Sequence, residues 1–181
     1  MTIFNKIAAT ALAVVTAFGS ASAAYAKPAL QPFNREGSRA LLDTVKADGV
    51  KVFIDEEFCF KEENRRLLGV ATSDERLLLC VKNHGGDYDE LADTLRHEVV
   101  HLAQYCKGRL LGTTIATIHP QHSRAYVRHA IEELNMPTQA YDRSKWAVEA
   151  EARVFAQYLD DAETARLYND FCVRPYQRQL A

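Results

Sequence analysis

The chain has 181 residues, 22 of them Lys or Arg and 24 Asp or Glu, which gives a formal net charge of −2 at pH 7. This length is typical of one globular domain with a short additional segment. The basic residues form no long run, so the sequence lacks the electrostatic footprint of a nucleic-acid-binding protein and gives no sign of an anionic membrane partner.

Residues 1–26 have the three-part pattern of a secretory signal peptide. Lys6 is their only charged residue, and residues 7–18 are almost entirely apolar. This apolar run is too short to cross a bilayer, which takes about 20 residues. An A-x-A cleavage pattern ends at Ala26, and a second one ends at Ala23. We predict that the segment is removed on export, that the mature protein is secreted or periplasmic, and that no stable membrane anchor remains.

The next part of the chain predicts a helix followed by short strands. Residues 36–47 have apolar positions at helical spacing and end before an Asp-Gly pair, which predicts a helix. Residues 50–54 are β-branched and aromatic, so we expect a strand there, and residues 58–60 could form another. Two apolar runs, 67–71 and 77–81, flank a polar stretch, which predicts a hairpin.

The C-terminal half predicts helices. A long one is expected over residues 88–107, closed by Gly108. Further helices are expected over residues 121–135, 143–160 and 162–171. Strands that precede helices, rather than alternating with them, are typical of an α+β fold. We therefore predict one α+β domain, with a small N-terminal sheet and hairpin followed by helices, over the mature chain.

The chain has four cysteines, all beyond the predicted signal peptide. Export permits disulfides, and four cysteines can form two of them in three ways. We expect Cys59 to pair with Cys80, since both are predicted to lie near neighbouring strands. Cys106 would then pair with Cys172 and tie a helix end to the C-terminal region. The alternative is that some of the thiols are free and buried.

The long predicted helix contains His97, Glu98 and His101 in the pattern H-E-x-x-H. Histidines four residues apart lie on one helix face and can bind the same metal ion, and the intervening Glu can act on a metal-bound water. On a helical wheel the three side chains lie beside one apolar stripe. The alternative is a pair of partly exposed histidines beside a glutamate that forms local ion pairs.

A catalytic zinc ion has three protein ligands and keeps one position for water, so two histidines do not complete the site. The residues after His101 lack the further Gly and His of the elongated H-E-x-x-H motif. A wheel of the predicted helix 143–160 places Glu149 on its apolar side and Glu151 on its outer face. A carboxylate that faces the core needs a partner or a metal, so we predict Glu149 as the third ligand. An ion pair with Arg153 is the alternative.

The H-E-x-x-H helix and the later segment Glu149–Ala152 resemble the gluzincin metallopeptidases, in which a Glu from a later helix joins the two histidines. The family often has an acidic residue after its E-x-x-A motif, and Arg153 stands there in this chain. The resemblance covers roughly residues 77–157. It implies a zincin-like fold in which the strand over residues 77–81 could pair with an extended peptide substrate.

The resemblance further implies one zinc ion per chain, bound by His97, His101 and Glu149. It implies hydrolysis of peptide bonds in protein or peptide substrates by a zinc-bound water, with Glu98 as general base. We therefore predict an exported zinc metallopeptidase. Two alternatives stay open: a zinc-dependent cell-wall amidase or peptidoglycan peptidase, which shares the chemistry, and a non-catalytic binding module on the same fold.

The residue that stabilises the oxyanion is not identified by the sequence. His119, His122, Tyr126 and Tyr141 lie between the two motifs, and nothing in their spacing selects one of them. We interpret His84, which precedes two glycines, as a loop residue.

Overall fold

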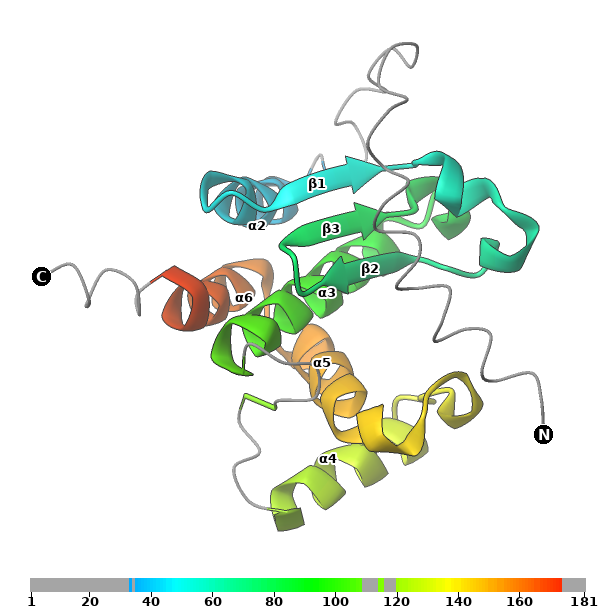
Figure 1. Cartoon of the computed structure of the whole chain (residues 1–181), viewed down its shortest axis with the longest axis vertical. Coiled ribbons are helices and arrows are strands. Elements are labelled where there is room, and N and C mark those ends of the chain that lie inside the picture. The colour runs from blue at the N-terminus through cyan, green and yellow to red at the C-terminus, as the bar shows by residue number, and fades with distance from the viewer. Residues whose placement is uncertain (1–32, 34, 109–113, 116–119, 174–181) are drawn as a thin grey trace, which may run out of the picture. The chain divides into compact units, whose positions relative to one another are not determined.

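The computed structural model of the chain (Figure 1) describes residues 33, 35–108, 114–115 and 120–173. These belong to one unit, Pro32–Ala181. The predicted signal peptide lies outside the described residues. The described part has an α+β fold, mostly helical with one three-stranded sheet, as the sequence predicts. Within it, no helix combines the length and apolar character needed to cross a membrane.

The sheet has the strand order β1-β3-β2, with β1 at Lys51–Ile54, β2 at Gly69–Thr72 and β3 at Arg76–Leu79. The antiparallel pair of β2 and β3 is the predicted hairpin. The first strand of the chain, β1, adds to the other edge of β3 in parallel. The alternating apolar residues of β3 face the core, where Leu77 and Leu79 are fully buried.

Two sequence predictions about the strands are wrong. Residues 77–81 cannot pair with a substrate strand, because β3 is central and hydrogen-bonded on both edges. Residues 58–60 do not form a strand, because they belong to the 3-10 helix η3, Glu57–Phe60, where the amide of Cys59 turns back to donate to the carbonyl of Glu56.

The helices lie close to their predicted ranges. The α-helices are α2 Glu36–Ala47, α3 Tyr88–Gly108, α4 Pro120–Glu132, α5 Trp146–Tyr158 and α6 Asp161–Tyr168, and a π-helical turn, η8, follows at Asn169–Val173. The other short 3-10 helices are η4 Glu62–Asn64, η5 Val81–His84, η6 Thr138–Ala140 and η7 Arg143–Lys145. Asp160 and Glu163 form a capping box that starts α6, which satisfies amides at the helix N-terminus.

Helix α3 is the centre of the fold (Figure 1). Leu91, Leu95, Val99 and Leu102, on one side of it, are buried in the core that contains the sheet residues Leu77 and Leu79. Each fully buried leucine contributes on the order of 2 kcal/mol. On another side of α3, Val100 and Ala103 pack with Ala152 of α5. Because α3 is held between the sheet and α5, its histidines face a second helix at a fixed distance.

Two disulfides link Cys59 to Cys80 and Cys106 to Cys172, which confirms both predicted pairings. The second ties the end of α3 to η8. Such bonds persist in oxidising compartments and are rare in reducing ones. The disulfides therefore fit a protein that functions outside the cytosol.

We expect the Cys106–Cys172 disulfide to stabilise the fold more than Cys59–Cys80, because it closes a loop of 66 residues rather than 21. The loop-entropy relation predicts losses of about 4 and about 3 kcal/mol, respectively, when each pair is replaced by alanines. Urea unfolding of the two double variants would measure this. A larger loss for the Cys59–Cys80 pair would contradict the expected order.

Candidate metal centre

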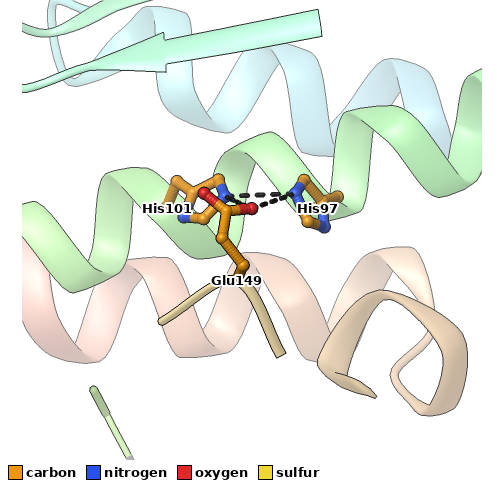
Figure 2. Close-up of side chains that lie close together, drawn as sticks. All are labelled: His97, His101 and Glu149. Carbon is orange, nitrogen blue, oxygen red and sulfur yellow. Dashed lines mark hydrogen bonds and ion pairs between the residues drawn. The ribbon is translucent and has the colours of Figure 1, made fainter. Parts of the chain in front are cut away.

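His97 and His101 lie one turn apart on α3, and Glu149 reaches them from the first turn of α5 (Figure 2). The Nε2 atoms of the two histidines are 3.1 Å apart. The Oε2 atom of Glu149 lies 3.4 Å from Nε2 of His101 and 3.6 Å from Nε2 of His97. The structure therefore brings the three predicted ligands together, with their donor atoms in a nearly equilateral triangle.

The triangle has the size that a tetrahedral metal ion requires. With metal–ligand distances of about 2.0–2.1 Å, tetrahedral geometry places the ligand atoms about 3.3–3.4 Å from one another. The observed separations of 3.1, 3.4 and 3.6 Å bracket this value. His97, His101 and Glu149 could thus hold a metal ion, and three ligands leave the fourth tetrahedral position for another molecule.

The site is shielded but reachable from solvent. The side chains of His97, His101 and Glu149 keep 18%, 10% and 17% of their surface exposed. This exposure is small enough to strengthen electrostatic interactions, and it leaves a route by which water or a substrate can arrive. A catalytic metal site needs both properties, whereas a structural site is closed by four protein ligands.

Glu98 does not belong to the triangle but lies beside it, buried and anchored to the sheet. Its Oε2 accepts a hydrogen bond from the amide of Ala71 in β2, at 2.6 Å. The hydroxyl of Tyr105, one turn after His101, is 3.4 Å from the carbonyl oxygen of Ala71, a longer contact. Both backbone groups of Ala71 therefore face α3 on the edge of β2 that is not paired with β3.

The close approach of β2 to α3 depends on Gly69. A Cβ at this position would lie 2.8 Å from Cγ of Glu98 and 2.9 Å from Cγ2 of Thr94. Both neighbours belong to α3, and because α3 is packed in the core it cannot move away from β2 without loss of stability. The absence of a side chain at residue 69 is what allows the Ala71 amide to reach Glu98.

We expect Gly69→Ala to separate β2 from α3 or to displace the Glu98 carboxylate. Overpacking of this kind costs about 1–3 kcal/mol of unfolding free energy, measurable by urea unfolding. The amount of metal bound should stay unchanged, because the triangle is built from other residues. A variant with unchanged stability would contradict the tight contact seen here.

Without a metal, Glu149 and His101 form an ion pair in which each group shifts the pKa of the other. Burial alone would lower the pKa of His101, but the hydrogen bond and charge of Glu149, with smaller effects from Glu98 and Gln104, raise it to about 9. Burial alone would raise the pKa of Glu149, but the two histidines hold it well below its usual range. At neutral pH the metal-free site therefore pairs a protonated His101 with an ionised Glu149.

The raised pKa makes metal binding depend on pH. A proton must leave His101 before Nε2 can bind a metal, so we expect zinc affinity to increase about tenfold per pH unit up to the pKa of about 9. Chelator competition at several pH values between 6.5 and 8.5 would measure this. An affinity that does not change over this range would contradict the coupling.

The stability of the metal-free protein should fall at high pH, where zinc affinity rises. The contribution of His101 to stability is complete below its ordinary pKa of 6.5 and is lost as the pH rises through about 9. The contribution of Glu149 is present above its ordinary pKa of 4.5 and is lost as the pH falls. Urea unfolding of the metal-free protein should therefore show the full contribution of the ion pair to the free energy of unfolding between pH 4.5 and pH 6.5.

The prediction that Glu151 lies on the outer face of its helix is wrong. Glu151 is fully buried, and its Oε2 accepts hydrogen bonds from Nε2 of Gln104 at 2.8 Å and from the amide of Ile115 at 2.5 Å. The wheel assumed a single apolar stripe. Helix α5 instead packs against α3 on one side and α4 on another, so most of its circumference is buried.

The two tyrosines that the sequence offered as candidates for stabilising the oxyanion have different surroundings. Tyr126 packs edge-on against Phe155 in the core between α4 and α5. Tyr141 is half-buried, and burial followed by the charge of Glu149 raises its pKa, against a hydrogen bond from Arg153. Of the two, Tyr141 is the one whose pKa is affected by the charge of Glu149, the predicted ligand.

The remaining histidines do not join the site among the described residues. His119 lies outside them, as does the side chain of His122. His84 is buried in the core rather than exposed in a loop, with Nδ1 3.0 Å from the carbonyl of Cys80 and Nε2 3.0 Å from the hydroxyl of Thr94. It links η5 to α3.

Sequence reasoning missed Gln104 and Tyr105, which follow His101 at helical spacings of three and four. Gln104 accepts from Nδ1 of His101 at 2.7 Å. Burial, then the charges of Glu98 and Glu149, raise the pKa of Tyr105 to about 12, so it stays a neutral hydroxyl. The i+3 and i+4 positions after a metal-binding histidine are the signal that could have identified them.

A pocket of about 190 Å³ lies near the C-terminal end of α3, away from the metal ligands. Tyr105 lines it, together with residues of the hairpin turn, the segment after α2, α6 and the Cys106–Cys172 disulfide. None of the three ligands contributes to its wall. We therefore identify the candidate site from the convergence of ligand atoms and not from this pocket.

Comparison of the chain with protein-family models, with curated proteins and with solved structures found no match. What the site does is therefore inferred from its own residues and their geometry.

Proposed function

We propose that this protein is an exported zinc metallopeptidase with a gluzincin-type site on a zincin-like fold. The observation that carries the proposal is the triangle of His97, His101 and Glu149 beside the anchored carboxylate of Glu98. Two histidines and one carboxylate, with an open fourth position, are the ligand set of catalytic zinc in peptidases. A ligand set of this kind suits hydrolysis better than structural metal binding.

When bound, zinc would polarise the scissile carbonyl and lower the pKa of a water molecule in the open position. The residues of the chain supply the rest. The amide of Ala71 holds the carboxylate of Glu98 through Oε2, and in this proposal that carboxylate takes the proton from the attacking water. Glu98 then passes that proton to the leaving amine as a general acid.

The substrate class in this proposal, a peptide, follows from the ligand set and the general base. The edge of β2 beside α3 is not open to a substrate strand at Ala71, because the Ala71 amide donates to Glu98 and the Ala71 carbonyl oxygen lies 3.4 Å from the hydroxyl of Tyr105. Tyr141 is half-buried and the charge of Glu149 contributes to raising its pKa, and on this ground we propose it as the donor to the developing oxyanion.

The proposal is tested by metal content and substrate choice. Elemental analysis of the purified exported protein should find close to one zinc per chain. Hydrolysis of an unfolded protein should stop with a chelator and return with added zinc. A metal-free protein that fails to take up added zinc would overturn the proposal. Activity on peptidoglycan fragments alone would favour a cell-wall amidase or peptidase, and inactivity on both at full zinc occupancy would favour a binding module.

A further inference from the structure

Behind His101, on the side away from the triangle, lies a chain of buried polar side chains. Nδ1 of His101 is 2.7 Å from Oε1 of Gln104, and Nε2 of Gln104 is 2.8 Å from Oε2 of Glu151. Gln104 is 2% exposed and Glu151 is 0% exposed. This series of hydrogen bonds therefore connects His101, the predicted ligand on α3, to the buried carboxylate of Glu151 on α5.

The orientation of the Gln104 amide follows from its partners. Its nitrogen donates to Oε2 of Glu151 and to the carbonyl of Val148, at 3.1 Å. A carboxylate and a backbone carbonyl offer oxygen acceptors to the amide nitrogen, so a flipped amide would place its oxygen against two other oxygens. Oε1 must therefore face His101 and accept a hydrogen bond from it.

An acceptor on Nδ1 determines which nitrogen of His101 can bind a metal. When Oε1 of Gln104 accepts the Nδ1–H proton, the lone pair of the neutral ring is on Nε2. Nε2 is the atom that faces His97 and Glu149 in the triangle. The hydrogen bond also limits rotation of the ring.

Glu151 enters this network as a fully buried carboxylate. A buried carboxylate is expensive unless hydrogen bonds compensate it. Its Oε2 accepts two of them, from Gln104 and from the amide of Ile115. Helix α5 thus supplies the predicted ligand Glu149 and also Glu151, the hydrogen-bond partner of Gln104.

We propose that Gln104 and Glu151 are positioning residues for the metal centre. Glu151 orients the amide of Gln104, and Gln104 holds the proton of His101 on Nδ1 so that Nε2 is available to the metal. This inference rests on the proposed function, since it assumes that His101 is a ligand.

The first test is zinc affinity measured by chelator competition on the full mature protein. Gln104→Met keeps the length of the side chain and removes its amide. The loss of a hydrogen-bonding partner behind a ligand lowers metal affinity about 10- to 100-fold, and we expect a loss of this size. Gln157→Met, an exposed position on α5, is the matched control and should leave the affinity unchanged.

The melting temperature of each metal-free variant establishes that it is folded. If Gln104→Met does not fold, the unmodified zinc-loaded protein gives the answer. Nitrogen-edited NMR should then show a slowly exchanging Nδ1–H of His101 with a nuclear Overhauser effect to the side-chain amide protons of Gln104. Its absence would overturn the inference.

The two hypotheses fail in different ways. An unmodified protein that binds no zinc would overturn the proposed function and the positioning role with it. A folded Gln104→Met variant that binds zinc as tightly as the unmodified protein would overturn the positioning role alone.

Discussion

Replacing Glu98 with Gln should lower the rate of hydrolysis by about 10²- to 10⁴-fold, the usual contribution of a general base, while zinc affinity changes by no more than a few-fold. The amide of Gln has nearly the shape of the carboxylate and can still accept from the Ala71 amide, as Oε2 of Glu98 does at 2.6 Å. It cannot take a proton from the attacking water. The fold and the triangle of ligands should therefore persist.

The matched control is Glu90→Gln, which removes a carboxylate from an exposed position on the same helix. It should hydrolyse substrate at the rate of the unmodified protein. The measurements are kcat with an unfolded protein substrate and zinc affinity by chelator competition. Full activity of Glu98→Gln would remove Glu98 from the chemistry, even if the metal site proved correct.

Replacing Glu149 with Gln should instead weaken zinc binding, by more than about 100-fold, which is the upper range for losing a partner behind a ligand. The substitution removes the charged oxygen that completes the triangle with His97 and His101. Hydrolysis at low zinc should fall in proportion to occupancy, and high zinc should restore part of it.

A second observable makes this prediction independent of activity. Because Glu149 is the main group that raises the pKa of His101 to about 9, that pKa should fall markedly in metal-free Glu149→Gln. Proton NMR of the imidazole would measure it. Glu132→Gln, exposed on α4, is the control. Unchanged zinc affinity in Glu149→Gln would exclude Glu149 as a ligand.

Local features of this protein are determined by its sequence because they depend on neighbouring residues. Helical spacing of apolar residues predicts α2 and α3, and a polar stretch between two apolar runs predicts the hairpin of β2 and β3. The spacing of His97 and His101 places them on one face of α3 in any fold that keeps the helix. Both predicted cysteine pairings are present, although Cys59 lies in the 3-10 helix η3 and not in the strand from which its pairing was predicted.

Other features depend on which elements pack together, and a helical wheel or a strand pattern does not contain this information. The parallel addition of β1 to β3 made β2, rather than β3, the strand with an edge beside α3. The packing of α5 between α3 and α4 buried Glu151, which a wheel with one apolar stripe placed outside. The same packing set the distances from Glu149 to the two histidines and joined Gln104 to Glu151, because contacts between distant segments arise only when hydrophobic burial orients whole helices against one another.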